Sequence, residues 1–124
     1  MTIQEAVELI DRIKPNQFNR ETKVKWLGKL DGMVYREIMQ THEGNPVESF
    51  TGYDAENPDT VLLVPYPYDE DVYGYFLCAQ VDSENGEMTK YNQSITMYNN
   101  AFKLFQDWYN RTHMPLPAKT AFIF

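Results

Sequence analysis

The chain has 124 residues, which is enough for one hydrophobic core but too few for two independent ones. Its aromatic content of 15% argues against intrinsic disorder, and its single cysteine, Cys78, excludes an intramolecular disulfide or a cysteine metal cluster. The net charge of −7 is concentrated in residues 43–89, which hold eleven acidic side chains and no basic one. That segment is unsuited to nucleic acid, because phosphate recognition needs Lys or Arg.

No apolar stretch approaches the roughly 20 residues that cross a bilayer. The first residues include Gln4, Glu5 and Glu8 in place of a basic and then apolar leader, so we expect no signal peptide and no contact with a membrane. A lone cysteine fits a reducing compartment, and we expect the protein in the cytoplasm.

Two amphipathic helices are predicted in the first third of the chain. Thr2 and Glu5 form a capping-box pattern ahead of a short helix that Pro15 ends. Asn19 is suited to cap a second helix, whose apolar positions recur at helical spacing up to about Thr41.

Two glycines, Gly28 and Gly32, lie one turn apart inside this second helix. Each costs about 1 kcal/mol relative to Ala in a helix interior. A close contact is the simplest reason for both, and we expect another helix to cross there.

Residues 43–66 are rich in glycine, proline and asparagine and lack a helical period, so we predict a long acidic loop between helices two and three. An apolar run at 61–64 is either a brief strand or a strip laid onto the helices. A solvated loop is the simpler interpretation of the acidic side chains, and a dedicated partner site is the alternative.

Two further helices are predicted in the second half. One begins near Tyr68 and is apolar on nearly every side, as expected in the middle of a bundle. Asn85 and Gly86 indicate a turn, although a single bent helix over 68–112 would keep the same register. The last helix covers about 87–112. Its predicted buried face alternates in steps of three and four (Met88, Tyr91, Ile95, Tyr98, Phe102, Phe105 and Tyr109) and is flanked by Met97, Ala101, Leu104 and Trp108.

Pro115 and Pro117 end that helix and leave an apolar tail. The sequence therefore predicts an all-α, four-helix bundle-like domain over residues 1–117, with the long acidic loop between helices two and three. We expect residues 118–124 to form an extended apolar C-terminal tail. The tail is β-prone, and it can fold back on its own domain or add as a strand to a neighbour.

We expect neither an enzyme nor a bound cofactor. General acid–base catalysis by a pair of carboxyl groups needs one group in a pocket that raises its pKa. The adjacent carboxylates at the predicted start of the third helix, Asp69, Glu70 and Asp71, are expected to be solvated instead. Cys78 lies among apolar residues with no histidine nearby in sequence, which favours a buried structural thiol.

The two histidines, His42 and His113, each follow a threonine at a predicted helix C-terminus, where the helix dipole favours them. A metal site completed by Glu43 is the alternative if the two helices run in parallel. Helix capping is the preferred interpretation, because only two imidazole ligands are available.

The last helix has no charged residue from Tyr91 to Phe102, and amide side chains recur every seven residues on one side of it. A freely solvated helix face normally carries Lys and Glu. The uncharged side therefore indicates an interface with other copies of the protein. The alternative is an ordinary bundle helix whose polar side faces solvent. The amide positions predicted to meet another subunit or partner are Asn92, Asn99 and Gln106.

Several segments resemble small proteins from the head-to-tail modules of tailed phages and prophages. They are Trp26-Leu27-Gly28-Lys29-Leu30-Asp31-Gly32, Tyr66-Pro67-Tyr68-Asp69-Glu70, Ala79-Gln80-Val81-Asp82, Asn85-Gly86-Glu87, Lys90-Tyr91-Asn92 and Asn110-Arg111-Thr112-His113-Met114-Pro115. The chain is similar over most of its length to the head–tail connector (adaptor, head-completion) family. These are small helical proteins that assemble as a ring beneath the portal, continue the DNA channel and present a surface to the next tail component.

The resemblance implies a virion structural protein that contacts copies of itself, the portal protein and tail-completion proteins. It would be found in the bacterial host cytoplasm during virion assembly and DNA packaging, and then in the virion neck, without sequence-specific binding of nucleic acid. The acidic segment would face the channel and repel the phosphates of the passing genome, with Glu48, Asp54, Glu56 and Asp59 as its candidate residues. The tail residues assigned to the subunit or partner interface are Phe122, Ile123 and Phe124.

Two other classes of function compete with this one. A stand-alone acidic binding or regulatory module in the bacterial cytoplasm would engage a basic partner, or mimic DNA, with strong salt dependence. A small hydrolase is disfavoured, because no nucleophile–base pair can be named in the sequence.

Overall fold

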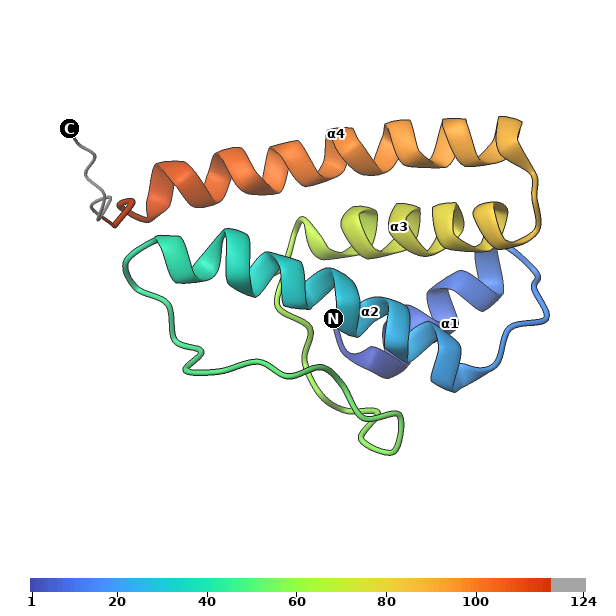
Figure 1. Ribbon diagram of the computed structural model, residues 1–124, viewed down its shortest axis with the longest axis horizontal. Coiled ribbons are helices and arrows are strands. Elements are labelled where there is room, and N and C mark those ends of the chain that lie inside the picture. Colours follow the sequence, from blue (N-terminus) through green and yellow to red (C-terminus); the bar gives the residue numbers. More distant parts are fainter. Residues whose placement is uncertain (117–124) are drawn as a thin grey trace.

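The computed structural model describes residues 1–116, and residues 117–124 lie outside the described part. The described residues form an all-α fold, as predicted. Its helices are α1 (Ile3–Ile13), α2 (Arg20–Glu37), the 3-10 helix η1 (Met39–Thr41), α3 (Asp69–Glu84) and α4 (Met88–Thr112). α1 and α3 run in one direction, and α2 and α4 run in the other (Figure 1). None of these helices is long and apolar enough to cross a membrane.

Helix α3 lies in the middle of the bundle, as predicted. It packs against each of the other three α-helices, whereas α4 rests on α3 alone within the described residues. Val72, Tyr73 and Leu77 of α3 are completely buried. A helix covered on three sides needs apolar residues around most of its circumference, which explains the absence of a single apolar stripe in this segment.

The two predicted helix starts are confirmed. The Thr2 hydroxyl accepts a hydrogen bond from the Glu5 N–H (3.2 Å), and the Glu5 carboxylate accepts one from the Thr2 N–H (2.8 Å). The Asn19 side chain accepts a hydrogen bond from the Thr22 N–H (2.9 Å). α2 ends one turn earlier than predicted, and the residues up to Thr41 continue as the tighter helix η1.

The predicted helix crossing at Gly28 and Gly32 is wrong, because the element that packs there is the long loop. A Cβ on Gly28 would lie 3.3 Å from the backbone nitrogen of Tyr53 and 3.6 Å from the Cα of Gly52. A Cβ on Gly32 would lie 3.8 Å from the ring of Phe50, an ordinary contact distance. Gly28 therefore keeps space for loop backbone, whereas Gly32 has room for a methyl group.

Helices α3 and α4 are separate and antiparallel, so the alternative of one bent helix over 68–112 is wrong. The chain reverses at Gly86, whose φ of +71° lies in the left-handed region that favours glycine. The Asn85 and Gly86 N–H groups donate to the carbonyls of Val81 (3.0 Å) and Ser83 (3.1 Å), which closes the end of α3.

The predicted buried face of α4 is buried only near its C-terminal end. Phe105 and Tyr109 are buried, together with Ala101. Met88 is 57% exposed, and the remaining positions of that face keep partial exposure: Tyr91, Ile95, Tyr98 and Phe102. The prediction is wrong for Met88 and holds in part for the others, since Tyr98 and Phe102 still pack against the core; α3 alone cannot cover so wide an apolar face.

The apolar run at 61–64 is a strip laid onto the helices. Leu62 and Val64 are buried against the core, and an isolated β-bridge between Val61 and Thr2 fixes the strip beside the start of α1. The division into a domain over 1–117 and a tail over 118–124 stays a prediction, since the tail lies outside the described residues.

Candidate interaction surfaces

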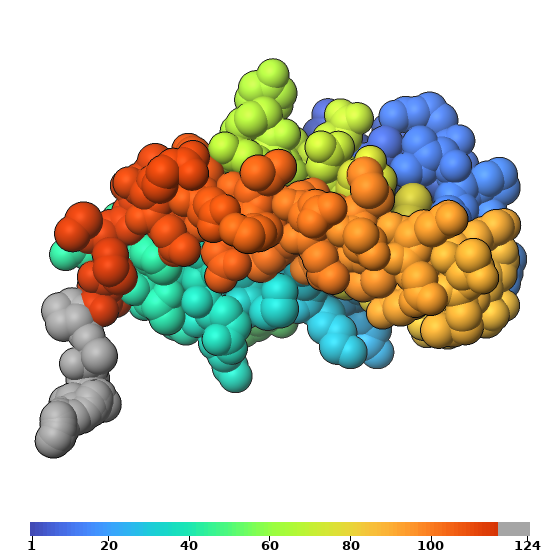
Figure 2. Space-filling model, turned by 90° about the horizontal axis from the view of Figure 1, so that it is seen from above, coloured from blue at the N-terminus to red at the C-terminus, as the bar shows by residue number. Residues whose placement is uncertain are grey.

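The outer surface of α4 is uncharged between Tyr91 and Phe102. Its exposed side chains in this stretch are Asn92, Gln93, Thr96, Met97, Asn99 and Asn100, and the exposed amide of Gln106 continues the row. Figure 2 shows α4 running along the molecule with this side uncovered. The three amides predicted to form an interface are therefore all accessible to a partner.

The amide row lies on the flank of α4 that faces α2. Trp108 packs against Tyr68 at the start of α3, with ring centroids 5.5 Å apart, whereas Tyr109 meets His42 at the end of η1, beyond α2, at 5.2 Å. Residues of a helix advance by about 100° each, so Asn99 and Trp108, nine residues apart, lie on opposite sides of α4. The Trp108 side faces Tyr68, and the exposed Asn99 side lies on the other flank, the one nearer α2.

The Trp108 side of α4 carries two apolar side chains that the sequence did not identify as surface. Met97 and Leu104 are 45% and 62% exposed. Helical spacing places both at the edge of a packing face. It does not show how much of that face the partner helix covers, and here α3 leaves both side chains largely exposed.

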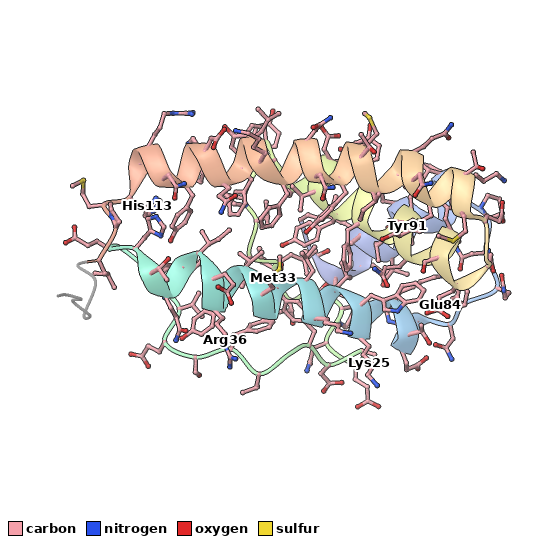
Figure 3. The ribbon with its side chains drawn as sticks, turned by 45° about the horizontal axis from the view of Figure 1, so that its top comes forward. Lys25, Met33, Arg36, Glu84, Tyr91 and His113 are labelled. Carbon is pink, nitrogen blue, oxygen red and sulfur yellow. The ribbon has the colours of Figure 1, made fainter. Side chains whose placement is uncertain are left out.

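A groove of about 370 Å³ lies between α2 and α4, with α3 as its floor. It exists because α2 and α4 do not pack against each other. In Figure 3, Met33 lies on the side of α2 that faces α4. The lining consists of Trp26, Lys29, Leu30 and Met33 from α2, Phe76 and Gln80 from α3, and Tyr98 from α4.

Tyr98 forms the α4 wall of this groove. Its ring centroid lies 5.5 Å from that of Phe76 and 5.7 Å from that of Phe102. Burial, and to a lesser degree the charge of Asp31, raise the pKa of the Tyr98 hydroxyl to about 12. Tyr98 is therefore neutral near pH 7, and Lys29 is the one charged residue among those that line the groove.

The long loop is tied to α2 and α3 by one completely buried carboxylate, Asp31. One of its oxygens accepts a hydrogen bond from the Tyr73 hydroxyl (2.6 Å). The other accepts from the Tyr53 hydroxyl and from the Leu63 N–H (3.0 Å). The Tyr73 hydroxyl itself accepts from the Val64 N–H (2.8 Å), so two helices and two points of the loop meet at one group.

Burial dominates the electrostatics of this cluster. It raises the pKa of Asp31, although the hydrogen bonds from Leu63, Tyr53 and Tyr73 act in the opposite direction. Burial, together with the charge of Asp31, also raises the pKa of both tyrosine hydroxyls, which therefore keep their protons and remain donors. We assign the enclosed cluster a structural role, which is to hold the acidic loop in place.

The sequence patterns do not single out Asp31, although a signal for it is present. Asp31 lies four residues after Leu27 and three before Val34, and thus within the apolar face of α2. A carboxylate on a buried helix face requires hydrogen-bond donors from elsewhere in the fold. Those donors come from the loop and from α3, and spacing along α2 cannot identify them.

The carboxylates predicted to face a channel are all exposed: Glu48, Asp54, Glu56 and Asp59. They do not form an isolated acidic surface, because Lys25 and Lys29 of α2 line the same hollow as residues 50–53 of the loop. Figure 3 shows Lys25 and Arg36 on the side of α2 that faces the loop. The acidic segment of the sequence thus lies beside a basic row in space.

The end of η1, which follows α2, and the C-terminal end of α4 meet through the two histidines. His42 Nδ1 lies 2.7 Å from the Ile38 carbonyl and His113 Nδ1 lies 3.3 Å from the Tyr109 carbonyl, which confirms both as helix C-caps. The His113 ring stacks on Tyr109 at 3.8 Å, and the His42 ring packs edge-on against the same tyrosine. In Figure 3, His113 points from the end of α4 toward the end of α2.

Backbone hydrogen bonds complete this contact. The Glu43 N–H donates to the Met114 carbonyl and the Leu116 N–H to the Thr41 carbonyl, both at 2.8 Å. The parallel course of α2 and α4 therefore does bring the two histidines together. Within residues 1–116, no three side chains of His, Cys, Asp or Glu are grouped so that they could hold a metal ion.

The carboxylates at the start of α3 differ from the prediction in one case. Glu70 and Asp71 are exposed, but Asp69 is buried and accepts a hydrogen bond from the Met1 amino group (3.1 Å). The prediction of a buried thiol at Cys78 is confirmed. Burial raises the pKa of this thiol, and a thiol that keeps its proton is a poor nucleophile.

Comparisons of the chain with protein-family models, with curated proteins and with solved structures give no match. The function is therefore inferred from the surfaces described above and from the sequence segments.

Proposed function

We propose that the protein is a head–tail connector, a structural protein that forms a ring below the portal of a tailed phage or prophage and links the head to the tail. The observation that carries the proposal is the uncharged, uncovered surface of α4 between Tyr91 and Phe102. A surface meant for solvent alone normally carries charged side chains, whereas the core of an interface is depleted of them.

The subunit contact uses the amide row in this proposal. Asn92, Asn99 and Gln106 each offer both a donor and an acceptor, so they can pair with polar groups of an adjacent copy without burying a charge. The acidic loop is available for the portal and tail-completion proteins, and in the assembled ring the apolar tail, with Phe122, Ile123 and Phe124, contacts these partners or a neighbouring copy.

The acidic loop forms part of the channel wall in the same proposal. Its exposed carboxylates are Glu48, Asp54, Glu56 and Asp59, and the Asp31 cluster holds the loop that carries them. Fixed negative charge keeps a passing genome from adhering to the wall. Because Lys25 and Lys29 lie nearby, the loop and not α2 has to face the channel. Assembly takes place in the host cytoplasm and ends in the virion neck.

Imaging the protein after incubation with its portal tests the ring. We expect stacked rings with the wild-type chain, and none with a variant that combines Asn92→Glu and Asn99→Glu. Thr89→Glu is the matched control, because it adds a carboxylate to an exposed position of α4 outside the uncharged stretch. All three chains should keep the same stability within about 0.5 kcal/mol, since surface substitutions rarely change it more.

Rings that assemble equally well with both carboxylates in place would contradict the proposed subunit contact. A monomer in the absence of the portal would not, because some rings form only on their partner. The channel assignment has its own test: Asp54→Lys with Glu56→Lys should impair passage or retention of DNA, and unchanged DNA handling would overturn it.

A stand-alone acidic binding module is the second candidate. The observation in its favour is that the carboxylates lie on a loop fixed by Asp31, which presents them in a defined arrangement. It predicts a monomer or dimer that captures a basic protein and releases it as NaCl is raised. Failure to stack on the portal together with salt-sensitive capture would favour this candidate.

A further inference from the structure

The groove between α2 and α4 has the chemistry of a peptide-binding site. We propose that it is a docking site for an extended apolar peptide, and that its occupant is the C-terminal segment of the same chain, residues 117–124. This inference concerns the single chain outside the ring, where the segment has no assembly partner to contact, so it is tested independently of the proposed ring.

The lining of the groove favours an apolar occupant. Trp26, Phe76 and Tyr98 are only half-buried, and Met33 is 41% exposed. Covering these side chains removes apolar surface from water, which is the main driving force for such contacts. Gln80 and the Tyr98 hydroxyl line the groove, so polar groups are available to the N–H and C=O groups of a bound backbone.

The C-terminal segment has the matching composition. It ends in three consecutive bulky apolar residues, Phe122, Ile123 and Phe124, and Lys119 is its one charged side chain. Aromatic and β-branched residues favour an extended backbone, the form in which a peptide can lie along a groove between two helices.

The segment also starts in the right place and has the right length. The N–H of Leu116 donates to the carbonyl of Thr41 at the end of η1, just beyond α2. At about 1.5 Å per helical residue, Met33 and Trp26 lie roughly 12 and 22 Å back along α2 from Thr41. Eight extended residues span about 27 Å at about 3.4 Å each, so residues 117–124 can cover the whole groove.

The covalent connection to α4 favours the chain's own C-terminal segment over that of a neighbouring copy as the occupant of the groove. A segment joined to its site by a few residues binds at an effective concentration of about 1 mM. The tail of another copy in dilute solution is present at far lower concentration, although its chemistry is the same.

The fluorescence of Trp26 tests whether residues 117–124 cover the groove. In a full-length chain with Trp108→Phe it is the only tryptophan, because the sequence contains two. Replacing Phe122 and Phe124 with Ser should shift its emission to longer wavelength and increase its quenching by acrylamide. Lys119→Ala in the same segment is the matched control and should leave both unchanged. Identical emission and quenching in all three chains would overturn the proposal.

A cysteine pair identifies which chain supplies the segment. Met33→Cys with Ile123→Cys, in a chain carrying Cys78→Ala, should form a disulfide within one chain under mild oxidation of dilute protein. Lys25→Cys with Ile123→Cys is the control, since Lys25 lies on the loop side of α2 (Figure 3) and should not be bridged.

A disulfide-linked dimer from the Met33 pair would show that the segment occupies a neighbour's groove, and would overturn the assignment to its own chain. Equal bridging at Met33 and Lys25, or none at either, would overturn the docking site itself. The portal is absent from these experiments, so their outcome is independent of ring assembly.

Discussion

Replacing Gly28 with Ala and, separately, Gly32 with Ala tests how closely the loop approaches α2. Ala is favoured over Gly by about 1 kcal/mol at both positions of the helix. At Gly32 the nearest atom to the new Cβ is 3.8 Å away, so Gly32→Ala should raise the free energy of unfolding by about 1 kcal/mol. At Gly28 the new Cβ meets the Tyr53 nitrogen at 3.3 Å, and the bond from the Tyr53 hydroxyl to Asp31 keeps the loop from retreating.

Overpacking of this kind costs about 1–3 kcal/mol, which cancels the helix propensity gain and leaves Gly28→Ala less stable than wild type by about 1 kcal/mol. The two alanine variants should therefore differ by about 2 kcal/mol in urea unfolding, or about 8 °C in melting temperature. In a Tyr53→Phe background residue 53 loses its hydrogen bond to Asp31, so the loop can yield at this point and the penalty at Gly28 should shrink, which a double-mutant cycle measures. Equal stabilisation by both alanines would refute the reasoning.

Further predictions follow from the buried groups. Tyr73→Phe should lower the free energy of unfolding by about 2–3 kcal/mol, and Tyr53→Phe by about 1–2 kcal/mol. The difference arises because the Tyr73 hydroxyl both donates to Asp31 and accepts from Val64, whereas the Tyr53 hydroxyl only donates to Asp31. Equal losses for the two variants in urea unfolding would contradict this reasoning. The pKa of Asp31 is raised in the folded state, so the folded protein binds this proton more tightly than the unfolded chain does. Protonation of Asp31 therefore stabilises the fold at low pH. This contribution to the free energy of unfolding falls as pH rises from near 3.8 through the raised pKa. The free energy of unfolding lost in Asp31→Asn should therefore be larger at about pH 4 than at about pH 7, and a loss that grows with pH would count against the sign of the shift. The Cys78 thiol, whose pKa burial raises, should react with a thiol reagent only as fast as the fold opens, and rapid labelling of the native protein would show that it is accessible.

The helices could be predicted from the sequence because their signals are local. The capping box at Thr2 and Glu5, the cap at Asn19 and the turn at Gly86 each act within a few residues of the position they define. The amide row of α4 was predictable for the same reason, since a helix places every seventh residue on nearly the same side.

The features that depend on tertiary contact could not be predicted in this way. The partner of Gly28 is loop backbone, which has no periodic pattern, and the donors to Asp31 come from points up to 42 residues away in the chain. The half-exposed face of α4 depends on how α2 and α4 diverge, which spacing along α4 does not encode. Charge along the chain was also misleading, because the acidic loop lies beside Lys25 and Lys29.

The Asp31 cluster joins a surface loop to the core in a single cooperative unit. Most surface loops open locally at little free-energy cost. Here, release of the loop would leave a buried carboxylate without two of its hydrogen-bond donors, the Tyr53 hydroxyl and the Leu63 N–H. The amide protons of Leu63 and Val64 should therefore exchange with solvent only when the core itself opens. A partner that binds this loop meets a surface that is already ordered, so little conformational entropy is lost on association.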